Sequence, residues 1–184
     1  MAKAGRTTIA LPPQPATASD MIVLEGQPAL SPFRRERLEA RLQALVPDLR
    51  ITGAWSTYWV DHEPGASPDL AALQRILEAG TATQPLAGGA VSRFVVPRLG
   101  TISPWPSKAT ELLGGAGLPV KRVERGTRID LLGMPDDPSA QAALSKLLHD
   151  PMTQSLLARR EDAARLFASL PPGPVEHGPL ASLA

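Results

Sequence analysis

Helix-starting dipeptides recur along this chain and constrain its fold more than any other feature. Ser31-Pro32, Ser67-Pro68, Ser103-Pro104 and Asp137-Pro138 each precede residues whose apolar side chains recur at helical spacing. Ser and Asp accept hydrogen bonds from the first free amides of a helix, and Pro at the first helical position needs no amide hydrogen. The sequence therefore predicts four helices that begin at these dipeptides.

The apolar face of each predicted helix supplies core residues. These faces consist of Leu38, Leu42, Leu45 and Val46 in the first helix, Leu70, Leu73, Ile76 and Leu77 in the second, Trp105, Ala109, Leu112 and Leu113 in the third, and Ala143, Leu144, Leu147 and Leu148 in the fourth. Because the spacing is that of an amphipathic helix, we expect each set to pack inward.

Apolar, β-branched and aromatic runs lie between the helix starts and predict strands. Residues 21–24, 50–60 and 91–96 have this composition, which suits a pleated, half-buried surface. Residues 119–133 are compatible with a pair of strands or with one long strand bent around Gly126. Strands and helices thus alternate, which indicates a layered α/β fold or a split βαβ sandwich.

Glycine and proline set the expected limits of several elements. Gly26 and Pro28 should break the first strand, Pro47 should end the first helix, and Gly80 should end the second. Gly53 interrupts the second strand, and we expect a bulge there. These limits rest on the conformational preferences of single residues.

The two ends of the chain differ from the middle. Residues 153–157 predict a short edge strand, and residues 159–170 predict a helix with acidic residues in its first turn. The remaining residues are linker-like. We expect a leader over residues 1–20, a folded domain over 21–157, and a helix with the start of a linker over 158–184.

Residues 1–20 combine two basic residues with prolines and small side chains. A signal peptide is one interpretation, because Ala16-Thr17-Ala18 resembles a cleavage site. The apolar run at 9–11 is, however, much shorter than the ~7–15 residues of a signal-peptide core. We therefore expect a disordered leader, with Met21 as a candidate start, and a cytoplasmic protein.

Composition argues against several classes of function. Lys and Arg number 19 and Asp and Glu 18, so the net charge is +1, unlike a strongly basic nucleic-acid binder. The chain has no cysteine, and so no disulfide, thiolate metal site or cysteine nucleophile. Its apolar stretches fall far short of the ~20 residues of a membrane span. We expect no nucleic acid and no membrane among its partners.

Motifs that carry catalysis are missing from the sequence. It has no phosphate-binding P-loop, dinucleotide fingerprint, nucleophile elbow or His-Glu-x-x-His zinc motif. His62, His149 and His177 stand at no metal-ligand spacing. The glycines at 114–117 follow a predicted helix, so their amides form no helix N-terminus for a phosphate. We expect no catalytic, cofactor-binding or metal-binding residue in this chain.

One segment, residues 98–110 (RLGTISPWPSKAT), has a composition that calls for explanation. It turns at Gly100 and enters a helix at Ser103. Its hydroxyls, with Arg98 and Lys108, could hold an anion at a helix N-terminus. The alternative is that Trp105 fills the core and the serine only caps the helix.

The same segment resembles the signature near the N-terminus of the large, PurL-type phosphoribosylformylglycinamidine synthases. Three further segments fall in the family's order: LEGQPALSPFR at 24–34, RVERG at 122–126 and LHDPMT at 148–153. The strand that holds Tyr58 matches in place. Pro106 departs from the pattern, because the family usually has Ser there.

This resemblance implies an α+β fold, similar to a dimer of the small PurS subunit fused into one chain. It also implies a reaction for the complete enzyme. A glutaminase domain with a Cys nucleophile hydrolyses glutamine, and ammonia travels internally to a synthase domain. There ATP activates the formamide oxygen of formylglycinamide ribonucleotide, and the products are the amidine, ADP and phosphate. The ATP and Mg sites belong to that synthase domain, which lies outside these residues.

We therefore expect the 184-residue chain to be inactive alone and to act as a structural part of the ligase. Its partners would be its own synthase and glutaminase domains or separate chains that carry them, and it would support the ammonia route. The residues expected at interdomain contacts are polar and lie in the matched motifs: Arg98, Thr101, Ser103, Ser107, Lys108, Thr110, Arg122, Glu124 and Arg125. The alternative is that several of them cap helices or pair with each other.

Two other interpretations of function remain open from the sequence. The chain could be a stand-alone, non-catalytic assembly subunit of a multi-chain synthase, since a binding module needs neither cysteine nor a phosphate loop. It could also be a regulator that responds to an anion at the helix start near Ser103.

Overall fold

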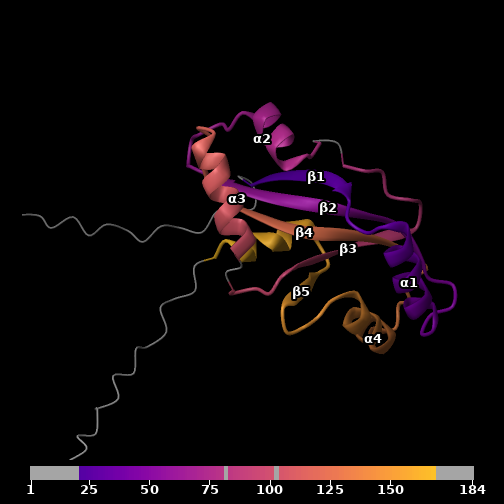
Figure 1. Cartoon of the computed structure of the whole chain (residues 1–184). Coiled ribbons are helices and arrows are strands. Elements are labelled where there is room, and N and C mark those ends of the chain that lie inside the picture. The colour runs from indigo at the N-terminus through magenta and orange to yellow at the C-terminus, as the bar shows by residue number, and fades with distance from the viewer. Residues whose placement is uncertain (1–20, 81–82, 102–103, 169–184) are drawn as a thin grey trace, which may run out of the picture.

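A computed structural model describes residues 21–80, 83–101 and 104–168 of the protein. Five antiparallel strands form one sheet in the order β1-β2-β4-β3-β5, with helices packed against it (Figure 1). This confirms the α+β class. The elements are β1 (Ile22–Pro28), α1 (Pro32–Gln43), β2 (Arg50–His62), α2 (Leu70–Leu77), β3 (Ala90–Pro97), α3 (Pro104–Gly115), β4 (Val120–Leu132), α4 (Pro138–Leu148), β5 (Gln154–Leu157) and the 3₁₀ helix η1 (Arg160–Leu166).

The order strand-helix-strand-helix occurs twice, once from β1 to α2 and once from β3 to α4. The two 13-residue strands β2 and β4 form the centre of the sheet, and each has its own half's other strand on its outer side. Their register pairs Arg50 with Leu132 and His62 with Val120, so the strands overlap end to end. The halves are thus related by an approximate two-fold axis between β2 and β4, as expected for two fused subunits.

Two helix pairs cover opposite ends of the same sheet face (Figure 1). Leu73 and Leu77 of α2 share a buried cluster with Leu113 of α3 and Val123 of β4. A second cluster joins α1 and α4 to β4 through residues that include Ile129. Because alternate residues of a strand point to the same side, both clusters lie on one face of β4.

The opposite face of the sheet is covered by the 3₁₀ helix η1. Ala163 and Leu166 pack on Trp59, Phe94 and other buried side chains of β2, β3 and β5. The indole Nε1 of Trp59 also donates a hydrogen bond to the carbonyl of Arg160 at 3.1 Å. The packed unit therefore continues past β5, and the helix predicted over 159–170 is a 3₁₀ helix over Arg160–Leu166.

A buried ion network crosses this second face. The guanidinium of Arg128 contacts Glu25 Oε1 at 2.6 Å and Asp130 Oδ1 at 2.8 Å. It also donates to the carbonyl of Gln84 at 3.0 Å, and Ser92 Oγ donates to Asp130 at 2.7 Å. The network ties β1, β3 and β4 to the segment that leads into β3, because its members come from all four.

Several local expectations are confirmed. Ser31 Oγ accepts from the amide of Arg34, and Asp137 Oδ2 accepts from that of Ala140. The register of β2 shifts between Ile51 and Gly53, which is the predicted bulge. Residues 119–133 form the single long strand, since β4 pairs with β2 on one side and β3 on the other.

Other expected limits are wrong. Strand β1 continues through Gly26 to Pro28, because it still pairs with β2 across a register shift. Helix α1 ends at Gln43, before Pro47. Leu45, placed in the predicted apolar face, consequently lies beyond the helix and is 50% exposed.

The second helix begins and ends differently from the prediction. Asp69 caps α2 in place of Ser67, since its Oδ1 accepts from the amides of Ala71 and Ala72. The chain leaves the helix at Glu78, which takes a left-handed conformation with φ of 51°, before Gly80. The predicted cap at Ser103 lies outside the described residues.

In the described part of the chain, no helix is long and apolar enough to cross a membrane.

Candidate functional site

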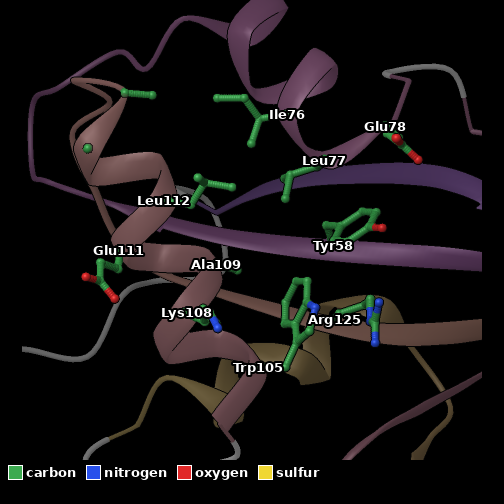
Figure 2. Close-up of a pocket in the computed structure, with 12 residues that line it drawn as sticks. Tyr58, Ile76, Leu77, Glu78, Trp105, Lys108, Ala109, Glu111, Leu112 and Arg125 are labelled. Carbon is green, nitrogen blue, oxygen red and sulfur yellow. The ribbon is translucent and has the colours of Figure 1, made fainter.

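An open groove of about 1140 Å³ lies between α2 and α3 (Figure 2). Tyr58 of β2 forms part of its floor. Ile76 and Leu77 line it from α2, and Ala109 and Leu112 line it from α3. The groove is therefore an apolar trough whose walls are two helices and whose base is the sheet.

An aromatic and cationic cluster forms one end of this groove. The rings of Tyr58 and Trp105 lie 6.1 Å apart with planes at 33°. The guanidinium carbon of Arg125 lies 4.6 Å from the Trp105 ring centroid, a cation–π contact. Lys108, one helical turn from Trp105, adds a second cation. This end can therefore attract a carboxylate or the negative end of a helix.

Acidic side chains line the groove farther from Trp105. Glu111 lies one turn beyond Lys108 on α3, and Glu78 follows the last residue of α2. Figure 2 shows Glu78 on the opposite side of the groove from Glu111, away from Trp105. The groove thus carries two cations at its Trp105 end and a carboxylate on each of its two sides farther from Trp105.

The groove exists because the two helix pairs pack differently. Helix α1 contacts α4 directly at one end of the sheet. At the other end, α2 has 8 residues where its counterpart α4 has 11, and α2 and α3 meet mainly through the core below them. Leu112 is 63% exposed in consequence, although its neighbour Leu113 is fully buried.

Residues 55–167 match the family model described as the N-terminal region of formylglycinamide ribonucleotide amidotransferase. The match covers more than half of the chain and includes every residue that lines the groove. The chain belongs to this amidotransferase N-terminal family. It is therefore an N-terminal domain of phosphoribosylformylglycinamidine synthase, an enzyme of purine biosynthesis.

Of the predicted contact residues that the structure of this amidotransferase N-terminal domain describes, Lys108 and Arg125 line the groove. Ser107 is exposed on α3. Arg98 and Thr101 lie at the turn after β3, where Thr101 Oγ1 donates to the Arg98 carbonyl at 2.6 Å. Their role in contacts between domains stays a prediction, as does that of Ser103, which lies outside the described residues.

Three more of the predicted residues also make bonds within the domain. Thr110 Oγ1 accepts from the amide of Val123 at 3.1 Å and so joins α3 to β4. Arg122 pairs with Glu124 on the opposite sheet face from the groove, and its guanidinium lies 5.8 Å from the Phe167 ring centroid. Arg122 and Glu124 thus pair with each other within the domain, and their role in contacts between domains stays a prediction.

Glu124 is almost completely buried, with 1% of its surface exposed. Its Oε1 accepts from Arg122, whereas its Oε2 has no hydrogen-bond partner among the described residues. Burial raises the pKa of this carboxyl above its ordinary value of 4.5, and the charge and hydrogen bonds of Arg122 oppose the rise. Folding therefore disfavours the ionised form of Glu124.

A second, shallower hollow of about 500 Å³ lies on the groove's side of the sheet, between the two helix pairs. Ser56 and Thr127 are paired across β2 and β4 at its base, near the two-fold axis. Arg125 lines both this hollow and the groove. Its side chain thus joins two neighbouring parts of one surface.

Among the described residues no three His, Cys, Asp or Glu side chains cluster as metal ligands. The ring Nδ1 of His149 lies 2.7 Å from the carbonyl of Ser145, at the end of α4.

Sequence reasoning assigned the groove's apolar residues to the core. Ile76 and Leu112 fit the helical spacing, but they line an open groove. One signal was available, because Leu112 and Leu113 are adjacent and lie about 100° apart around the helix, so both need not face the core. The acidic side chains of Glu78 and Glu111 carried no comparable signal.

Proposed function

We propose that this domain is the non-catalytic docking domain of phosphoribosylformylglycinamidine synthase. It would bind the synthase and glutaminase domains and support the passage of ammonia between them. Glutamine hydrolysis and the ATP-dependent step, with Mg, would take place in those other domains. The observation that carries this proposal is the apolar groove with its exposed Leu112, because exposed apolar surface of this kind marks an interaction site.

A reconstitution experiment tests this function. The purified 184-residue chain is assayed for amidine formation from formylglycinamide ribonucleotide, ATP and glutamine, alone and with the polypeptides that carry the synthase and glutaminase domains. We expect no turnover by the chain alone. We also expect that adding it raises the amidine formed per glutamine hydrolysed, because docking organises the ammonia route.

Two results would contradict the proposal. One is measurable turnover by the isolated chain, which would require a catalytic site within it. The other is a synthase and glutaminase pair that couples glutamine hydrolysis fully to amidine formation without this domain. This second result is established if the amount of amidine formed per glutamine hydrolysed is the same with and without the chain.

A further inference from the structure

We propose that the groove between α2 and α3 binds one amphipathic helix from the synthase or glutaminase part of the same enzyme. The bound helix would run with its C-terminal end, with at least one carboxylate, near Lys108 and Arg125 and its N-terminus toward Gly115, at the other end of α3. This inference rests on the proposed docking function and specifies where and how docking occurs.

The first argument is the unequal packing of the two halves. Helices α1 and α4 close on each other, whereas their counterparts α3 and α2 leave a groove. The shorter α2 removes about one helical turn from the wall of this groove, 8 residues against 11. A helix from outside the domain would restore the contact that the closed half makes by itself.

The second argument is the character of the lining. The groove's middle is formed by apolar side chains from both helices, and Leu112 there exposes 63% of its surface (Figure 2). A helix lying between two others buries side chains that recur every three to four residues, which is the helix-in-groove mode of recognition. The length of α3, about 18 Å for 12 residues at 1.5 Å per residue, suits a partner of two to three turns.

The two cations at the Trp105 end of the groove favour one direction of the bound helix. Arg125 is held over Trp105 by the cation–π contact, with Lys108 on the adjoining turn of α3. A helix carries partial negative charge at its C-terminus and partial positive charge at its N-terminus. The cations therefore favour the C-terminal end of the bound helix at the Trp105 end of the groove, so its N-terminal end would lie toward Gly115.

A binding experiment tests the groove. The 184-residue chain is titrated against the polypeptides that carry the synthase and glutaminase domains, and the dissociation constant is compared with those of three variants. Leu112→Asp should weaken binding at least tenfold. Lys108→Glu should weaken it several-fold. Phe33→Asp is the matched control, because Phe33 is a 69% exposed apolar residue on the counterpart helix α1, and it should bind within twofold of the wild type.

The possible outcomes separate the two proposals. If the wild-type chain does not bind, the docking function is wrong. If it binds and both groove variants bind equally well, docking stands and the groove assignment is wrong. If Leu112→Asp instead dissociates a self-associated form of the wild-type chain, the occupant is a second copy. Thermal unfolding of each variant checks folding, and Leu112→Ser replaces the aspartate variant should that one be unstable.

Cross-linking tests the helix and its direction. The chain has no cysteine, so Lys108→Cys and Gly115→Cys each introduce a single attachment point for a photoreactive group in the groove. Gly115 has open space around its Cα. The two positions lie seven residues apart on α3, which is about two helical turns. They should therefore label two places about two turns apart in one partner segment, and the place labelled from position 115 should be the more N-terminal. Labels on unrelated segments, or in reverse order, would overturn the proposal.

Discussion

Arg125 lies over the indole of Trp105, with its guanidinium carbon 4.6 Å from the ring centroid, and so fixes a positive charge at one end of the α2–α3 groove. The contact joins β4 to the first turn of α3. It positions a long, flexible side chain that would otherwise sample many rotamers, which lowers the entropy lost when a partner binds.

Arg125→Ala should affect binding more than folding. Arg125 is exposed, so removing its cation–π contact should lower the free energy of unfolding by about 0.5–1 kcal/mol at most. Binding to the synthase and glutaminase polypeptides should weaken several-fold, because a positioned charge is lost. Urea unfolding and a binding titration measure the two effects. A large loss of stability with unchanged binding would show that Arg125 acts only within the domain.

Arg128→Met should destabilise the domain strongly. The substitution leaves Glu25 and Asp130 buried without their shared cation, and breaking a buried ion pair in this way costs about 3–5 kcal/mol. Equilibrium urea unfolding measures the loss. Arg159→Met is the matched control: Arg159 pairs with Asp162 at the surface, and we expect almost no change there. Equal effects of the two substitutions would contradict the assigned importance of the buried network.

Glu124→Gln should change how stability depends on pH. The folded-state pKa of Glu124 lies above 4.5, so the native protein binds a proton more readily than the unfolded chain between these two values. The contribution of Glu124 to the free energy of unfolding is therefore fully present below pH 4.5 and is lost as pH rises through the folded-state pKa. We expect the variant to lack this decrease, as measured by urea unfolding at successive pH values.

Asp162→Asn provides a control of opposite sign for that experiment. Hydrogen bonds from Arg159 lower the pKa of Asp162 below its ordinary value of 3.8. The contribution of the Arg159–Asp162 pair to the free energy of unfolding is present above pH 3.8 and is lost as pH falls through the folded-state pKa of Asp162. The prediction for Glu124 is contradicted if the free energies of unfolding of wild type and Glu124→Gln change with pH in parallel. That result would show that Glu124 titrates in the folded protein as it does in the unfolded chain.

Gly126→Ala should destabilise the centre of the sheet. A Cβ at this position would lie 2.6 Å from the carbonyl oxygen of Val95 and 2.9 Å from Cζ3 of Trp59. A backbone oxygen held in the sheet cannot move aside, so we expect a loss of about 1–3 kcal/mol. Calorimetric unfolding measures it. Gly115→Ala, with nothing within 4 Å of the new Cβ, should be neutral or stabilising. An unchanged melting temperature for Gly126→Ala would contradict this close packing.

The features predicted correctly from the sequence depend on near neighbours. Ser31 and Asp137 cap their helices because each side chain reaches an amide three residues away. Predictions from local residue preferences were wrong where two nearby features favoured different structures. Asp69, directly before the helix, makes two hydrogen bonds to α2 and so displaces the predicted start at Ser67. Gly26 remains in β1 because pairing with β2 outweighs the weak strand preference of glycine.

The sequence by itself determined the alternation of strands and helices and the four motifs that point to the synthase family, whose resemblance implies the α+β class. Only the tertiary structure decided that Leu113 is buried while Leu112 faces a groove, and that Arg125 and Lys108 lie together while Arg122 and Glu124 lie on the other face. The physical reason is the distance along the chain between the residues that decide each feature. Caps and turns depend on a few adjacent residues, whereas exposure in a groove depends on how far apart two helices stand after both have packed on one sheet.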